Sequence, residues 1–195
     1  MDSLYLKKEQ LISMLESFGL YNSTKFEIVI EGRVLRYFLK KKERLCIFQV
    51  PLQEDYTYET DLLICNILLN INKSYFTDEI KTLSLEDQID SLNLVLAILE
   101  DLEFYDFYLN RAISKQKILE NTYQRTIYFS REIDIVVSFN EIVIKPEGPS
   151  ISPSKIYLCQ SFSYSVLRDI CSFVLKMSKQ MQEDYDYLSK VSQWV

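Results

Sequence analysis

The residues from Phe26 to Val50 have the sequence FEIVIEGRVLRYFLKKKERLCIFQV. This stretch contains three runs of β-prone residues, which are Phe26 to Glu31, Arg33 to Lys40 and Arg44 to Val50. A tight turn at Glu31-Gly32 and a charged turn at Lys41-Lys42-Glu43 separate the runs. Connections this short join antiparallel neighbours. The stretch therefore predicts a three-stranded antiparallel meander.

A second meander is expected in the C-terminal half, where the apolar period changes from that of a helix to strict alternation. Its expected strands are Thr126 to Ser130, Ile133 to Phe139 and Ile142 to Lys145. The turn Asn140-Glu141 joins the last two strands, and a further short strand is expected at Lys155 to Cys159.

Segments with helical periodicity flank both meanders. The first helix is expected from Asp2 or Ser3 to Gly19, and the second, apolar around nearly its whole circumference, from about Thr57 to Ile71. A third helix begins at the capping residue Ser84 and runs to about Leu109. A long helix from about Ser163 ends the chain, and its expected inner face is Val166, Ile170, Phe173, Val174, Met177, Met181, Leu188 and Val191.

These elements predict an α+β fold, with two antiparallel three-stranded meanders packed with amphipathic helices in the order αβββα-αβββα and with helices at both ends. The length of 195 residues favours a single compact domain over residues 1–195. Two tightly packed halves, 1–76 and 84–195, are the alternative.

Composition removes several kinds of chemistry. The chain has no histidine, so an imidazole base and histidine-ligated metal sites are excluded. Only three glycines are present, and no glycine-rich phosphate loop occurs. The cysteines Cys46, Cys65, Cys159 and Cys171 are widely spaced in apolar runs, which is typical of core packing. We therefore expect a non-enzymatic protein without a cofactor, a metal or a catalytic residue.

A basic hairpin over residues 33–44 carries the main alternative function. Its cations Arg33, Arg36, Lys40, Lys41, Lys42 and Arg44 flank Tyr37 and Phe38, a combination suited to binding nucleic acid. Lysines at a sheet edge also discourage strand pairing between molecules, which explains them without a ligand. The formal net charge of −6 disfavours an extensive nucleic-acid surface.

Aromatic residues among acidic ones mark two candidate partner-binding segments. One contains Phe104, Tyr105, Phe107 and Tyr108, beside Glu100, Glu103 and Asp106. The other lies near the end of the last helix and contains Tyr185, Tyr187 and Trp194. Such residues anchor protein interfaces, although the aromatics of the first segment fit inward packing equally well. The three acids could also hold a divalent ion.

Two resemblances are limited in extent. Asp134 and Lys145, on successive expected strands, resemble the metal-binding strand pair of restriction-endonuclease-like nucleases, but Val143 occupies the position of the second acid, which implies at best a non-cutting scaffold. The order of elements in the first half is similar to that of type III secretion chaperones, which are small, acidic and dimeric. That similarity is one of arrangement and transfers no residue roles.

The sequence thus predicts an intracellular, cytoplasmic adaptor or assembly subunit that binds another protein or a second copy of itself and does not enter a membrane; a nuclear location fits it too. The N-terminus lacks the layout of a signal peptide, and the longest apolar stretch, Leu62 to Ile71, is too short to span a bilayer. The alternative is a nucleic-acid-binding protein that uses the hairpin 33–44, on a degenerate nuclease-like scaffold.

Overall fold

A computed structural model gives the arrangement of the chain. It describes residues 3–21, 23–40, 44–53, 56–77, 83–105, 118–120, 124–159 and 162–194. Within these ranges, no helix is long and apolar enough to cross a membrane.

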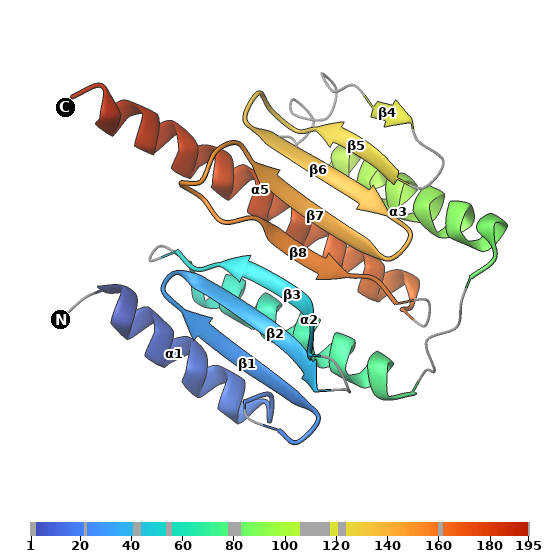
Figure 1. Ribbon diagram of the computed structural model, residues 1–195, viewed down its shortest axis with the longest axis horizontal. Coiled ribbons are helices and arrows are strands. Elements are labelled where there is room, and N and C mark those ends of the chain that lie inside the picture. Colours follow the sequence, from blue (N-terminus) through green and yellow to red (C-terminus); the bar gives the residue numbers. More distant parts are fainter. Residues whose placement is uncertain are drawn as a thin grey trace.

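The centre of the fold is one antiparallel sheet of eight strands (Figure 1). The strand order is β1-β2-β3-β8-β7-β6-β5-β4. The strands are β1 (Phe26–Glu31), β2 (Val34–Lys40), β3 (Arg44–Pro51), β4 (Ile118–Glu120), β5 (Gln124–Tyr128), β6 (Ile133–Ser138), β7 (Glu141–Pro146) and β8 (Ser154–Tyr157).

Four helices complete the described part of the fold: α1 (Ser3–Ser17), α2 (Tyr58–Thr77), α3 (Leu85–Tyr105) and α5 (Tyr164–Ser192). Helices α2, α3 and α5 lie behind the sheet in Figure 1, and the face turned to the viewer carries none of them. Burial alternates accordingly along the strands, as in β6, where Ile133, Ile135 and Val137 are buried and the residues between them are only half-buried. The sheet therefore has one core face and one open face.

The α+β class predicted from the sequence is confirmed, and the structure adds how the two meanders meet. Strand β8 pairs with β3 through Phe48 and Ile156, and with β7 through Ile142 and Ile156. The short strand after the second meander thus joins both meanders into one sheet. This partnership connects segments more than a hundred residues apart, which periodicity within a segment cannot reveal.

Local signals set the helix ends, as expected. Gly19 follows α1 with a φ of 69°, in the left-handed region that glycine adopts without strain. The Ser84 hydroxyl accepts a hydrogen bond from the Asp87 backbone N–H at the start of α3. The same hydroxyl donates to the Asp87 carboxylate, whereas in a standard capping box that side chain reaches back to the backbone.

A buried ion pair fastens α1 to α2. The Lys7 ammonium lies 2.5 Å from the Asp61 Oδ2 atom and 2.5 Å from the Tyr56 carbonyl oxygen, and both charged residues are buried. The other carboxylate oxygen, Oδ1, is buried without a hydrogen-bond partner among the described residues. Burial raises the pKa of Asp61, and the hydrogen bond from Lys7 opposes this shift. The Lys7–Asp61 pair is thus a buried polar interaction between α1 and α2.

The cysteines divide into two groups. Cys65 and Cys171 are buried in the core, as the sequence indicated, whereas Cys46 and Cys159 are only half-buried. Burial raises the pKa of Cys65 and of Cys171 to about 12. At neutral pH neither thiol is ionised, and the thiolate is the reactive form.

We expect iodoacetamide at pH 8 to leave Cys65 and Cys171 unmodified in the folded protein, because their thiols are both inaccessible and protonated. Both should be alkylated fully in denaturant. Peptide mass spectrometry after timed labelling would measure each site separately. Labelling of Cys171 in folded protein as rapid as in denaturant would contradict its buried position.

Candidate protein-binding surface

Helix α5 is the longest helix of the described structure and begins with a clear cap. The Ser163 hydroxyl accepts a hydrogen bond from the Val166 backbone N–H, as an N-cap serine does. From Leu167 to Met181 its apolar residues recur at helical spacing and are buried in the core. Helix α5 contacts α2 and α3 and strands β6 and β7.

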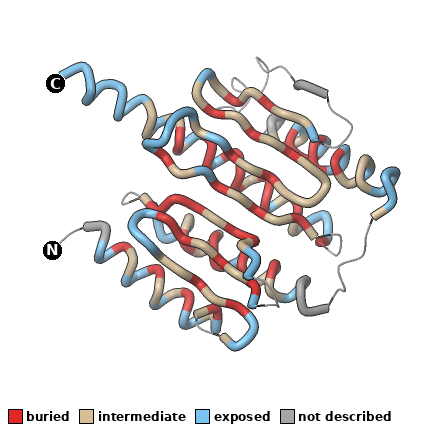
Figure 2. Tube along the Cα trace, in the orientation of Figure 1, coloured by how far each residue is buried: buried red, intermediate tan, exposed pale blue. Residues whose placement is uncertain are grey.

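The apolar side of α5 continues after the helix leaves the core. Met181 is fully buried, but Leu188 is 42% exposed and Val191 is 43% exposed. Figure 2 shows this end of the helix as an exposed segment that extends past the strands. The prediction that Leu188 and Val191 belong to the inner face is therefore wrong. Periodicity shows which side of a helix is apolar, but it does not show where the sheet beneath that side ends.

The three aromatic residues predicted near the C-terminus differ in their exposure. Tyr185 is partly buried and packs against the core. Tyr187 is 67% exposed and Trp194 is 89% exposed. Together with Leu188 and Val191, the exposed pair forms what we call the α5 end patch: Tyr187, Leu188, Val191 and Trp194.

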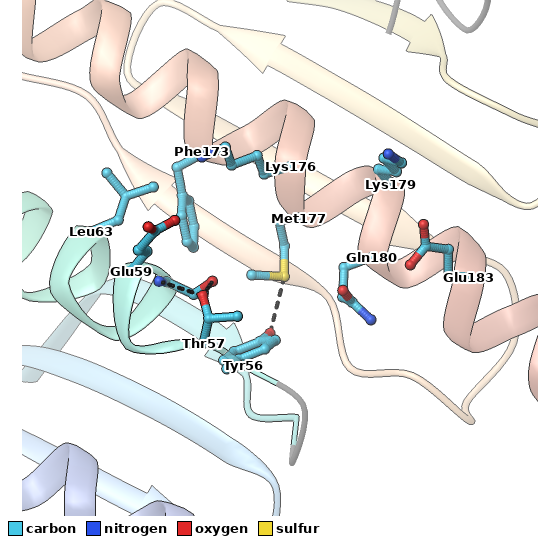
Figure 3. Close-up of a pocket in the computed structure, with 11 residues that line it drawn as sticks. Tyr56, Thr57, Glu59, Leu63, Phe173, Lys176, Met177, Lys179, Gln180 and Glu183 are labelled. Carbon is cyan, nitrogen blue, oxygen red and sulfur yellow. Dashed lines mark hydrogen bonds between the residues drawn. The ribbon is translucent and has the colours of Figure 1, made fainter. Parts of the chain in front are cut away.

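Two hollows lie along α5, one before this patch and one that reaches it. The first has a volume of about 280 Å³ and lies between α5 and the start of α2 (Figure 3). The second, of about 680 Å³, lies between α5, the residues after β3 and the loop before β8. Gln180 and Glu183 line both hollows, and Tyr187 and Leu188 line the second. The α5 end patch is thus continuous with concave surface.

Hydrogen bonds hold Tyr56 in place at the base of the first hollow. Figure 3 shows the Tyr56 side chain below Met177, with its hydroxyl 3.2 Å from the methionine sulfur. The same hydroxyl donates a hydrogen bond to the Pro51 carbonyl oxygen, which ties the start of α2 to the end of β3. Apolar floor residues such as Leu63 and Phe173 lie beside the charged rim residues of α5.

Charged residues on this part of α5 occur in blocks of one sign. Lys176 and Lys179 precede Glu183, Asp184 and Asp186, and Lys190 follows them. The Asp184 and Asp186 carboxylates accept hydrogen bonds from Gln180 and Gln182, one turn earlier in the helix. Glu183 and Lys190 are exposed, and neither takes part in an ion pair identified among the described residues.

The other predicted partner-binding segment lies largely outside the described residues. Phe104 and Tyr105 belong to the last turn of α3, but their side chains are not among those described, and Phe107 and Tyr108 lie outside the described ranges. The prediction for this segment therefore falls outside the side chains that the structure describes. Glu103 and Asp106 likewise have no described side chain.

The described cations of the basic hairpin are engaged within the protein. Arg44 lies 3.1 Å from Glu27, and its guanidinium lies 3.9 Å from the centre of the Phe38 ring. Arg36 donates a hydrogen bond to Gln49 and lies 3.7 Å from Glu31. These contacts reduce the positive charge available to a phosphate.

The two other described cations of that hairpin, Arg33 and Lys40, lie at opposite ends of β2. Lys40 donates to the Ser23 carbonyl oxygen, and Arg33 is at the turn and lines the second hollow. Lys41 and Lys42 lie outside the described residues. Tyr37 is buried and Phe38 lies on the open face, so the two rings have opposite orientations, as alternation predicts.

The nuclease-like residue pair is a cross-strand pair on the open face. Asp134 on β6 is directly opposite Lys145 on β7, and Val143 is opposite Val136. Partial burial raises the pKa of Asp134, and Lys145 opposes that shift. In the described part of the chain no group of three or more potential ligand residues could hold a metal ion. Glu147 also raises the pKa of Asp134, but it does not lie at the position of the second acid, which Val143 occupies.

Sequence reasoning found Tyr187 and Trp194 but missed the two hollows. Their linings come from five separate segments, so no motif could indicate them; the available signal was the apolar spacing of α5 beyond Met181. No protein-family model, curated protein or solved structure matches the chain. The α5 end patch and its hollows are therefore interpreted from their geometry alone.

Proposed function

We propose that this protein is a non-enzymatic adaptor or assembly subunit, which works inside the cell by binding a partner protein through the α5 end patch. The observation that carries the proposal is the continuation of the buried apolar side of α5 into solvent, at Leu188 and Val191. Where a helix extends past the core of its own protein, its apolar side can be buried only against another surface.

The residue types support a protein partner. Tryptophan and tyrosine are enriched among the residues that dominate binding energy, because each buries a large area with few rotatable bonds. Trp194 and Tyr187 are the most exposed of the four residues in the patch. Charged residues such as Glu183 and Lys190 border it, which corresponds to the polar rim of a protein interface.

Nucleic acid is the weaker candidate. Phosphate binding requires cations that can release counterions, and the described part of the hairpin 33–44 places Arg36 and Arg44 beside Glu31 and Glu27. The α5 end patch itself contains no cation, and its border has three acidic residues, Glu183, Asp184 and Asp186, against one cation, Lys190. A polyanion would be repelled there.

A photo-crosslinking residue in place of Val191 tests the proposal. In the native cell, we expect the Val191 variant of the full chain to form a discrete covalent adduct, because that side chain is exposed and lies between Leu188 and Trp194 along the chain. Mass spectrometry of the adduct would identify the partner.

The matched control carries the same photo-crosslinking residue in place of Asp169. This exposed position is on the same helix but far from the patch. The proposal would be wrong if the Val191 variant gave no adduct beyond those of the Asp169 variant.

A further inference from the structure

We infer that the partner of the α5 end patch is a second copy of this chain, with the two α5 ends packed antiparallel around a two-fold axis. The inference rests on the proposed function and gives it a specific occupant. It comes from the order of charges along the C-terminal part of α5 and the turn after it, from Lys179 to Trp194.

The patch has a defined flank. Tyr187 and Val191 are four residues apart and share one side of the helix. Trp194 follows Val191 by three residues in the turn after α5, where its backbone N–H donates to the Val191 carbonyl oxygen. Glu183 precedes Tyr187 by four residues, and Lys190 precedes Trp194 by four. Both charged residues therefore border the same edge of the patch, two helical turns apart.

An antiparallel pair makes this edge complementary to itself. Two-fold symmetry brings the same edge of both helices together, and residue i then contacts residue j while j contacts i. If the axis passes between Asp186 and Tyr187, Lys190 of each copy is opposite Glu183 of the other. The interface thus gains two equivalent ion pairs at its flank, in the positions that set partner choice in paired helices.

A parallel pair lacks this complementarity. It would place Lys190 beside Lys190, and Glu183 beside Glu183, and like charges at such short distances repel. Neither residue has an ion pair among the described residues of its own chain, so both are available at the surface. Charge order therefore selects the antiparallel arrangement.

The same two-fold axis also determines which residue of the other copy lies opposite Trp194. The residue opposite Trp194 is then Lys179 of the other copy, which lines the first hollow and is next to Gln180, a residue of both hollows. An indole ring over a lysine ammonium is a favourable cation–π contact. The antiparallel pair thus brings each exposed tryptophan to the concave surface of the opposite molecule.

Light scattering over a range of concentrations tests the inference on the full chain. We expect a mass of twice 23.1 kDa at high concentration that falls toward 23.1 kDa on dilution, because a pair of helix ends is a small interface. The single tryptophan gives a second readout, since its emission should shift to the red as dilution exposes Trp194.

Charge reversal distinguishes the register. Lys190→Glu should weaken dimerisation at least about tenfold, because both ion pairs become repulsive. The double variant Glu183→Lys with Lys190→Glu should restore the dimer, since it exchanges the two charges. Asp169→Lys is the matched control and should dimerise like the wild type. Circular dichroism would verify that every variant is folded.

Three results would overturn the inference. One is a mass of 23.1 kDa at every concentration up to about 1 mM, where even a millimolar dimer would be well populated. Another is that neither Lys190→Glu nor the double variant dimerises. The exchange of charges would then not restore the dimer, which excludes this register. The third is a Val191 photo-adduct that contains only a different protein, which would leave the proposed function standing.

Discussion

Replacement of Lys7 by methionine is expected to destabilise the protein by about 3–5 kcal/mol, because it leaves a buried carboxylate without its counter-charge. Lys7 provides the only hydrogen bond to the Asp61 carboxylate found among the described residues, and Oδ1 is already without one. Urea denaturation followed by circular dichroism would measure the loss in the free energy of unfolding.

Two further variants separate the ion pair from simple loss of packing. Lys8→Met changes the same residue type one position away, where the side chain is only half-buried, and should alter stability by less than about 0.5 kcal/mol. The double variant Lys7→Met with Asp61→Leu removes both charges and should recover most of the loss, because apolar residues often replace a buried ion pair without a penalty. Equal losses in the single and double variants would contradict this explanation.

The pH dependence of the Lys7→Met variant provides a second measurement. Burial raises the pKa of Asp61 already in the wild type, and removal of Lys7 takes away the group that opposes this shift. A carboxyl whose pKa is higher in the folded than in the unfolded state binds protons preferentially when folded. The deficit of the variant should therefore be largest at neutral pH and shrink as the pH falls toward the ordinary aspartate pKa. A deficit independent of pH would contradict this assignment.

Replacement of Phe173 by alanine is expected to cost about 3–5 kcal/mol, the usual range for a large aromatic ring removed from a core. Phe173 is buried on α5, and its ring centre lies 6.0 Å from that of Phe48 on β3. The contact joins the first meander to the C-terminal helix. We therefore expect both parts of the sheet to lose stability together.

Hydrogen exchange measured strand by strand would test this coupling. In Phe173→Ala, exchange should accelerate in β1–β3 as well as in β6–β8. Acceleration confined to the C-terminal strands would contradict one cooperative unit. Phe139→Ala is the matched control, since this ring is only half-buried at the β6–β7 turn, and its loss should be about 1 kcal/mol. A double-mutant cycle with Phe48→Ala should give a coupling of about 0.5–1.5 kcal/mol.

The local features of this fold could be predicted from its sequence because each depends on nearby residues. Alternation of apolar residues placed the strands Phe26–Glu31 and Ile133–Ser138, and Ser163 and Gly19 marked helix ends. Tyr185, Tyr187 and Trp194 were predicted to bind a partner from their position near the end of a helix, and of these Tyr187 and Trp194 are exposed. The absence of histidine and the scarcity of glycine excluded whole classes of chemistry without any structure.

Contacts between segments that are far apart in the sequence could be learned only from the tertiary structure. Strand β8 occupies the place between β3 and β7, and the Lys7–Asp61 pair fastens α1 to α2, although neither partnership has a sequence signal. Leu188 and Val191 have the spacing of core residues, yet they are exposed because the sheet ends before α5 does. Periodicity is a property of one helix, whereas burial depends on what other segments lie against it. For that physical reason, the apolar residues that carry the proposed function were predicted as core.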